Sequence, residues 1–200
     1  VATSQKSYQS AVEVEGQRLL KEGVNQISSQ GMSNIAHANG DYAIISQALS
    51  TTANNIYSQV AQIDPKGARD TANAQTAGLI TEVLNRVDVT APQDIETINA
   101  LSSWLSSKDA MQLDPKTRAS VLKSITVKQG EVQDVQKSFN DATLNQADYA
   151  VNTGKQVDRT WLLKMDSDNR ASMLRGDMSP EDYSSNNKKI WGILSKADKD

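Results

Sequence analysis

Two copies of one short motif divide this chain into amphipathic runs: Ile63-Asp64-Pro65-Lys66 and, fifty positions later, Leu113-Asp114-Pro115-Lys116. An aspartate at the N-cap of a helix accepts hydrogen bonds from first-turn amides that otherwise have no partner. Proline suits the first helical position because the N–H that it lacks would go unused there. Both motifs therefore predict helix starts. Because each stands where one run ends and the next begins, they also predict packed antiparallel helices joined by short connections.

The first run, about 4–34, carries apolar residues and glycines at the three- and four-residue steps of one helix face. Gly16 and Gly23 both fall on that face, which predicts close approach by a neighbouring helix. The alternative is a helix that is loose without a partner, because glycine inside a helix costs about 1 kcal/mol relative to alanine. The expected inward-facing residues are Tyr8, Val12, Gly16, Leu20, Gly23, Val24 and Ile27.

A second run, about 41–62, follows Asn39-Gly40 with Asp41 as the expected cap, and its apolar residues recur every seven positions. Heptad spacing is typical of coiled coils, but the flanking residues are serine, threonine, glutamine and asparagine instead of paired charges. A seam inside a bundle is therefore favoured over a dedicated zipper. The expected seam consists of Tyr42, Leu49, Ile56 and Ile63, with Ile45, Ala53 and Val60 beside it.

Similar signals mark the rest of the chain, with glycine as a helix terminator and capping or acidic residues at helix starts. The predicted elements are four helices, from Asp64-Pro65 to about 86, from Thr90-Ala91-Pro92 to about 107, from Asp114-Pro115 to about 142 and from there to about 165, followed by a short helix from Asp168 to Arg175-Gly176 and a last helix from Ser179-Pro180. The expected apolar faces include Leu122, Ile125, Val132, Val135 and Phe139 in the long run, Trp161 and Leu162 in the next, and Tyr183, Ile190, Trp191 and Leu194 in the last.

No stretch of four to eight residues alternates apolar and polar side chains, so the sequence predicts no strand. The expected fold class is all-α: helical hairpins packed as a bundle or as an elongated array, with about six main helices plus a short one. The second motif suggests an N-terminal helical region at 1–112 and a C-terminal one at 113–200, with one continuous domain as the alternative. Because Val1 is not an initiator methionine, we expect a processed chain or a fragment, whose end at 196–200 frays or continues into further sequence.

Composition excludes several kinds of function. The 24 acids and 21 bases are spread along the chain and give a net charge of -3, so no basic stripe predicts specific nucleic-acid binding. The absence of cysteine excludes disulfides and thiolate sites, and a single histidine excludes a multi-histidine zinc site. No apolar stretch approaches the roughly 20 residues that a transmembrane helix needs.

Two short motifs and the single histidine have a simpler structural interpretation than a functional one. Asp166-Ser167-Asp168-Asn169 resembles the opening of a calcium loop, but Arg170-Ala171 follows where the loop needs a ligand and a glycine, so a capped helix start is favoured. Arg175-Gly176-Asp177 matches an adhesion tripeptide, yet its glycine is explained as a helix terminator. His37 is interpreted as an ordinary helix-end side chain.

No motif predicts a nucleophile with its base, a glycine-rich phosphate loop or a catalytic carboxylate pair. We therefore expect no catalytic, cofactor-binding or metal-binding residues and interpret the protein as not an enzyme. An enzyme with an unrecognised cleft remains a further alternative.

The three tryptophans are the largest apolar side chains of a chain poor in aromatic residues, which makes them candidate anchors for a partner. Trp104 and Trp161 lie in apolar helical faces and are expected to pack internally. Trp191, with Ile190 and Tyr183 on the same helix, is the predicted site of partner contact.

Four stretches combine helix starts with small-residue helix bodies: Gly40-Asp41-Tyr42-Ala43, Ala48-Leu49, Ile63-Asp64-Pro65-Lys66-Gly67-Ala68-Arg69 and Leu113-Asp114-Pro115-Lys116-Thr117-Arg118-Ala119. The segment from Gly40 through Ile125, in which they lie, resembles the helical body of tailed-phage internal virion proteins, also called ejection proteins. The resemblance implies a protein stored in the virion interior and expelled with or before the genome. It also implies assembly with copies of itself and sister virion proteins into a conduit across the host envelope and periplasm, and it transfers no catalytic residue.

Two functions therefore compete. The first is a structural protein that self-associates, contacts the host envelope and forms a conduit for genome delivery. The second is a helical effector, adhesin or translocator-like protein that binds one partner as a monomer. The oligomeric state separates the two.

Overall fold

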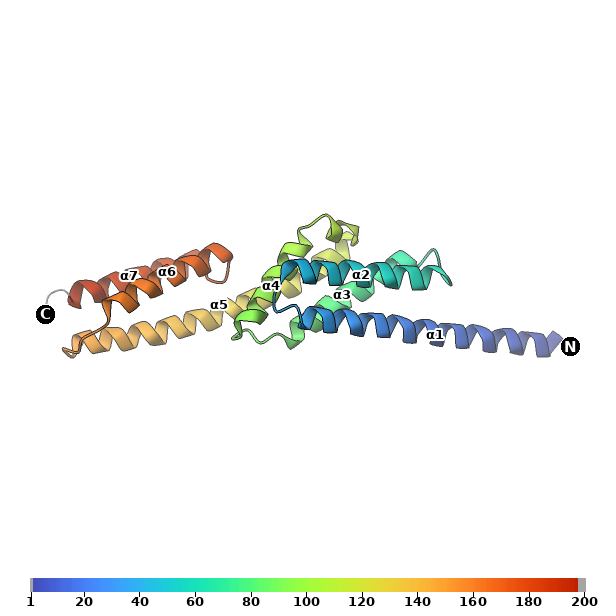
Figure 1. The fold of residues 1–200 in the computed structure, drawn as a ribbon, viewed down its shortest axis with the longest axis horizontal. Helices are drawn as coiled ribbons and strands as arrows, with labels where there is room; N and C mark the ends of the chain where they lie inside the picture. Colours follow the sequence, from blue (N-terminus) through green and yellow to red (C-terminus); the bar gives the residue numbers. More distant parts are fainter. Residues whose placement is uncertain (1, 198–200) are drawn as a thin grey trace. The chain divides into compact units, whose positions relative to one another are not determined.

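The computed structural model describes the backbone of residues 2–197, with the side chains of residues 9–110 and 112–197 (Figure 1). Within this part the chain is all-α, as predicted, and contains no strand. None of the helices in it is long and apolar enough to cross a membrane. The elements are α1 (Ala2–Ala36), α2 (Tyr42–Ala61), α3 (Ala68–Arg86), α4 (Pro92–Leu105), the 3₁₀ helix η1 (Asp109–Gln112), α5 (Pro115–Asn152), α6 (Arg159–Arg175) and α7 (Pro180–Ala197).

The chain divides into two compact units, Val1–Ile125 and Thr126–Asp200. The division falls inside α5, whereas the sequence suggested regions of 1–112 and 113–200 that meet at the helix start. Tyr8, predicted to face inward, lies outside the residues whose side chains are described. Residues 198–200, predicted to fray, lie outside the described backbone.

The first unit is organised around α2, which contacts α1, α3 and α4. Its seam residues Ile45, Leu49 and Ile56 are completely buried, as the heptad spacing predicts. The two ends of the predicted seam are exposed instead. Tyr42 is the first residue of α2, and Ile63 lies in the turn that follows the helix. Other fully buried residues of this core are Ile35, Ile80, Leu84, Ile98 and Leu101.

The two Asp-Pro motifs behave differently. Asp114 caps α5 as predicted, since its carboxylate accepts hydrogen bonds from the amides of Lys116 and Thr117, both at 3.0 Å. Asp64 does not cap α3, which begins only at Ala68. Its carboxylate instead accepts a hydrogen bond from the Gly67 amide at 3.0 Å. A β-turn favours aspartate, proline and glycine at its first, second and fourth positions, which are Asp64, Pro65 and Gly67 here. The second motif has threonine in place of this glycine, and there the helix begins at the proline.

Glycine on α1 permits close packing, but not at both predicted positions. A side chain at Gly23 would meet Gln59 of α2, whereas nothing lies within 4 Å of Gly16. The closest approach is at Gly31, where a Cβ atom would collide with Thr52 of α2 and come within 3.1 Å of Leu79 of α3. The contact face of α1 therefore starts near Leu20 and runs toward the C-terminal end of the helix.

The second unit contains the later part of α5 together with α6 and α7. Three ion pairs, Lys137–Asp182, Asp141–Lys189 and Asp148–Lys196, advance in the same direction along α5 and α7, so these helices are parallel and α6 runs antiparallel to both (Figure 1). The core cluster consists of Leu144, Ala147, Val151, Leu162, Met165, Ile190, Ile193 and Leu194.

Several boundaries in this unit differ from the prediction. No helix ends at 142: α5 continues to Asn152, and the chain turns at Gly154, whose φ is 72°. Asp158 caps α6, so Asp168 lies inside that helix, paired with Lys164, and caps no short helix. The predicted terminator at Gly176 is confirmed, since it has a left-handed φ of 87°. Ser179 caps α7 by accepting from the Asp182 amide at 3.0 Å.

One asparagine from each helix is buried in this unit. Asn140 of α5, Asn169 of α6 and Asn186 of α7 are all less than 5% exposed. The side-chain amide of Asn140 donates to Asn169 Oδ1 at 3.1 Å. The Nδ2 atoms of Asn169 and Asn186 have no hydrogen-bond partner among the described residues. The core of the second unit is thus interrupted by a polar layer that costs stability.

Candidate interaction surface

A second stripe, apolar except at Gln146, runs along α5 in the second unit, away from the core. It consists of Val135, Phe139, Ala142, Gln146 and Tyr149, and we call it the outer stripe. All five residues are exposed, and Phe139 and Tyr149 are 64% and 66% exposed. The steps between them are four, three, four and three residues, which is the seam spacing of a coiled coil.

The outer stripe and the core stripe lie on nearly opposite sides of one helix. The core-facing residues of this part of α5 are Asn140, Leu144, Ala147 and Val151, which have the same four-three-four spacing. At about 100° per residue, the centres of the two stripes are about 150° apart around the helix axis. Because α6 and α7 cover only one side of α5, the other seam is left without a partner helix.

This geometry corrects the predicted inward face of the long run. Ile125 and Val132 are buried as expected, but Leu122, Val135 and Phe139 are exposed. The predicted inward face combines residues from two different faces of α5. The signal that separates them is present in the sequence, since two heptad series offset by five residues run through 135–151.

Two carboxylates of α5 are directed toward α7 and away from the outer stripe. Asp141 and Asp148 pair with lysines of α7 at 2.6 and 2.7 Å, and the Lys196 hydrogen bond lowers the pKa of Asp148 below its ordinary value. The neighbours Ser138, Thr143 and Asn145 of the later part of the stripe are uncharged, whereas Glu131 and Asp134 lie at its start, close to Val135. An apolar helix that docked on Phe139 and Tyr149 would therefore displace little tightly bound water from charged groups.

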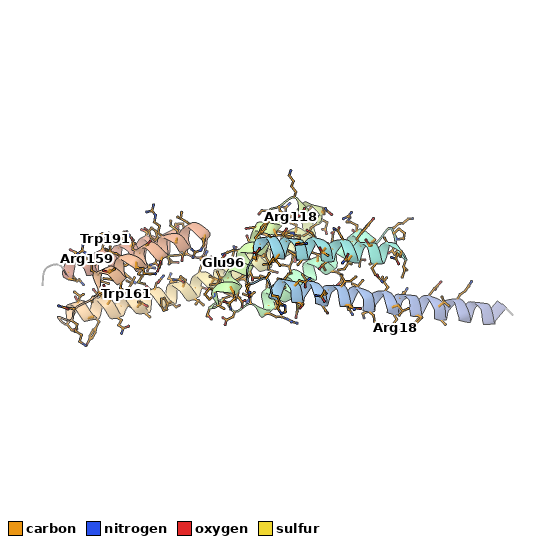
Figure 2. All side chains as sticks on the ribbon, viewed as in Figure 1. Arg18, Glu96, Arg118, Arg159, Trp161 and Trp191 are labelled. Atoms are coloured by element: carbon orange, nitrogen blue, oxygen red, sulfur yellow. The ribbon has the colours of Figure 1, made fainter. Side chains whose placement is uncertain are left out.

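The three residues predicted to contact a partner differ in how far they are exposed. Ile190 is completely buried in the core of its own unit, so it is not available to a partner in this structure. Tyr183 is half-buried, and Trp191 is 50% exposed on α7. Trp104 packs internally as expected, but Trp161 is 40% exposed and it is its neighbour Leu162 that fills the core. Figure 2 labels Trp161 and Trp191 on their two helices.

A further exposed apolar segment lies at the start of α1, where residues 9–19 reach past α2 and leave Val12, Val14 and Leu19 exposed (Figure 1). Val12 was predicted to face inward and does not. Arg18, labelled in Figure 2, pairs with Glu15 at 2.6 Å and with Glu22 at 2.5 Å. Its hydrogen bonds lower the pKa of Glu15, and its own pKa is raised by the two carboxylates. These pairs support a stretch of helix that has no packing partner.

The remaining sequence motifs lie in helices or at helix ends. Asp166–Asn169 lie in regular turns of α6 and form no loop. Arg175 and Asp177 bond to each other at 2.9 Å, and Asp177 is largely buried. His37 Nδ1 lies 2.7 Å from the Ser33 carbonyl oxygen of the preceding turn. Among the described side chains, those of residues 9–110 and 112–197, no three from histidine, aspartate or glutamate are grouped to hold a metal ion.

No protein-family model, curated protein or solved structure matches this chain. The resemblance to internal virion proteins therefore gains no support from these comparisons, and its functional content stands as a proposal.

Proposed function

We propose that this protein is a structural or interaction protein that associates with further copies of itself through the outer stripe of α5. The observation that carries the proposal is the second heptad seam, Val135 to Tyr149, on a helix whose other seam already forms a core. A seam with this spacing accepts a facing helix in knobs-into-holes packing, and a second copy supplies such a helix.

The exposed area supports a weak association. Burying the exposed parts of Phe139 and Tyr149 removes roughly 250 Å² per copy from water, worth roughly 6 kcal/mol at about 25 cal/mol per Å². Two facing stripes would gain about twice as much, against about 4–15 kcal/mol of lost freedom on association. The low net charge of -3 adds little repulsion between copies. We therefore expect association that depends strongly on concentration.

The biological form of this proposal follows from the resemblance: a virion ejection component that assembles, with sister proteins, into a conduit across the host envelope. Assemblies of many copies would reinforce a weak pairwise contact, because each copy can use more than one surface. The exposed segment at the start of α1 offers a second such surface. The alternative is a monomeric effector, adhesin or translocator-like protein that uses the same stripe for one foreign helix.

The test is the molar mass in solution, measured by light scattering and sedimentation over a wide concentration range. The wild-type mass should rise with concentration, and the double variant Phe139→Gln, Tyr149→Gln should remain monomeric because glutamine keeps the helix and removes the apolar anchors. Leu174→Gln is the matched control, since Leu174 is 74% exposed on α6, away from the stripe. A wild-type chain that stays monomeric throughout, or a double variant that associates like the wild type, would refute self-association through the stripe.

A further inference from the structure

The outer stripe of α5 has an uneven profile that limits how a second copy can face it. From its start to its end it reads Val135, Phe139, Ala142, Gln146 and Tyr149. The two aromatic rings are 64% and 66% exposed, and between them lie the shortest side chain of the stripe and a long amide. Because protein interiors are close-packed, the two side chains that face each other in a pair must together fill each layer.

The heptad positions decide which residues can face each other. Phe139 and Gln146 share one seam position, whereas Val135, Ala142 and Tyr149 share the other. In a parallel, in-register pair each residue faces its own equivalent. In an antiparallel pair the two seam positions face each other, and one register sets Phe139 opposite Tyr149 and Ala142 opposite Gln146. Only this antiparallel register places both aromatic rings against stripe residues of the other copy.

The antiparallel register fills its layers more evenly than the parallel one. A parallel pair joins Phe139 to Phe139 and, in the next layer, Ala142 to Ala142, so bulky rings stand beside a layer that leaves a void. The antiparallel pair has a phenylalanine and a tyrosine in both outer layers and an alanine and a glutamine in both central ones, the alternation that a close-packed seam needs. The parallel pair gains a hydrogen bond between two Gln146 amides. In the antiparallel pair the short Ala142 leaves each of these amides room to reach water at the edge of the seam.

Charge also favours the antiparallel pair. Glu131 and Asp134 lie at the start of the stripe, and the neighbours of its later part are uncharged. A parallel pair brings these carboxylates of both copies to one end, whereas an antiparallel pair keeps them at opposite ends. Lys128 already pairs with Glu131 at 2.7 Å, so the difference comes chiefly from Asp134 and is reduced by salt.

This face of α5 is ready for such a pair without refolding. On the core side, α6 and α7 hold the helix through the apolar cluster and through the ion pairs Asp141–Lys189 and Asp148–Lys196. The outer stripe faces away from them, so a second copy neither breaks these contacts nor has to nucleate a helix. The pair therefore loses less conformational entropy than two isolated segments of the same length would lose.

Building on the self-association proposed above, we infer that two copies pair through antiparallel α5 helices, with Phe139 of each copy against Tyr149 of the other and Ala142 against Gln146. Such an interface is isologous, which means that both copies use the same surface and that the pair is closed. The outer stripe thus makes dimers and is fully used in doing so. A larger assembly must add another surface, for which the exposed start of α1 is available.

Disulfide trapping tests the orientation, because the chain has no cysteine of its own. Ala142→Cys and Gln146→Cys are oxidised separately and as an equal mixture, and covalent dimers are measured by non-reducing electrophoresis. Only the mixture should give a covalent dimer. In each variant alone the two cysteines of an antiparallel pair are offset by four residues, or about 6 Å along the helix axis, which is too far across a helix–helix contact for a disulfide.

The trapping experiment separates failure of the orientation from failure of self-association. Leu174→Cys, exposed on α6, reports random collision. Covalent dimers from each single variant, with no more in the mixture, would show a parallel pair and overturn the antiparallel arrangement while self-association through the stripe stands. No covalent dimer above the Leu174→Cys control in any sample would overturn both.

Mixing glutamine variants is an independent test, measured as molar mass by sedimentation. Phe139→Gln and Tyr149→Gln, each alone, lose both aromatic layers of an antiparallel pair. A mixed pair recovers one Phe139–Tyr149 layer, so the equal mixture should dimerise roughly tenfold more tightly than either variant alone. In a parallel pair each variant alone keeps one aromatic layer and the mixed pair keeps none. A mixture that dimerises no more tightly than the separate variants would therefore contradict the antiparallel arrangement.

Discussion

The buried asparagine pair of the second unit gives a sharp prediction about stability. Asn140 and Asn169 are hydrogen-bonded to each other, and Asn169 keeps an unpaired Nδ2 in the core. We compare three variants of the full chain: Asn140→Leu, Asn169→Leu and the double variant. Leucine has a similar branched shape and removes the polar atoms, so the comparison separates the cost of burying the pair from the cost of breaking it.

The expected changes in unfolding free energy follow from the burial and the hydrogen bond that each variant alters. Asn169→Leu gains about 2 kcal/mol from apolar burial but leaves Asn140 Nδ2 without its acceptor, which costs about 1–3 kcal/mol. Each single variant should thus stay within about 1 kcal/mol of the wild type. The double variant leaves neither partner of this bond unpaired and gains about 4 kcal/mol, of which overpacking removes about 1–3 kcal/mol. It should be more stable than the wild type by about 2 kcal/mol. Because each single variant carries one unpaired partner and about half of the overpacking, the coupling between the two sites should be about 2–4 kcal/mol.

The assay must report on one unit, because a chain with two compact units does not have a single unfolding free energy. Native-state hydrogen exchange of peptides from α6 and α7 measures the opening of the second unit directly. Peptides from α2 and α3, in the first unit, are the internal reference and should not change. A double variant less stable than both single variants would refute the reasoning, because it would mean that the asparagine pair stabilises the unit.

Two further predictions concern packing and pH. Gly31→Ala should destabilise the contact of α1 with α2 and α3, because its Cβ would collide with the buried Thr52. Gly16→Ala has open space around it and should raise the stability of α1 by up to about 1 kcal/mol. Hydrogen exchange of α1 peptides measures both effects, and equal effects of the two changes would contradict this account. The lowered pKa of Asp148 means that its pairing with Lys196 stabilises the fold above the ordinary aspartate pKa and is lost as pH falls below about 4. Protection of α7 should therefore fall in acid, and less steeply in Asp148→Asn; an unchanged slope in that variant would exclude the pairing as the cause.

The fold class and most helix starts could be predicted because they depend on local chemistry. Asp41, Asp114 and Ser179 bond to amides two or three residues away, and such bonds form wherever the chain begins a helix. Asp64 shows the limit of the same rule, since an identical Asp-Pro-Lys sequence is captured by a turn when glycine follows. The decisive residue stands outside the motif.

The faces of the helices were harder to predict because they depend on which elements meet. Phe139 fits the apolar spacing of a helix as well as Leu144 does, and only the positions of α6 and α7 decide which one is buried. The pocket where α2, α3, α4 and η1 meet could not be found from the sequence either. Ser50, Arg69, Trp104 and Asp109 are separated by up to 59 positions and are brought together by the packing of four elements.

The exposed start of α1 has a consequence for how quickly a partner can engage this protein. Isolated helices are costly to nucleate in water, but residues 9–19 extend a helix whose later turns are already fixed against α2 and α3. The Arg18 ion pairs hold the intervening turns. A binding protein would meet a preformed helix with Val12 and Leu19 one heptad apart, so binding would not wait for this segment to fold. Raised salt should slow binding only by weakening the Arg18 ion pairs that stabilise the helix.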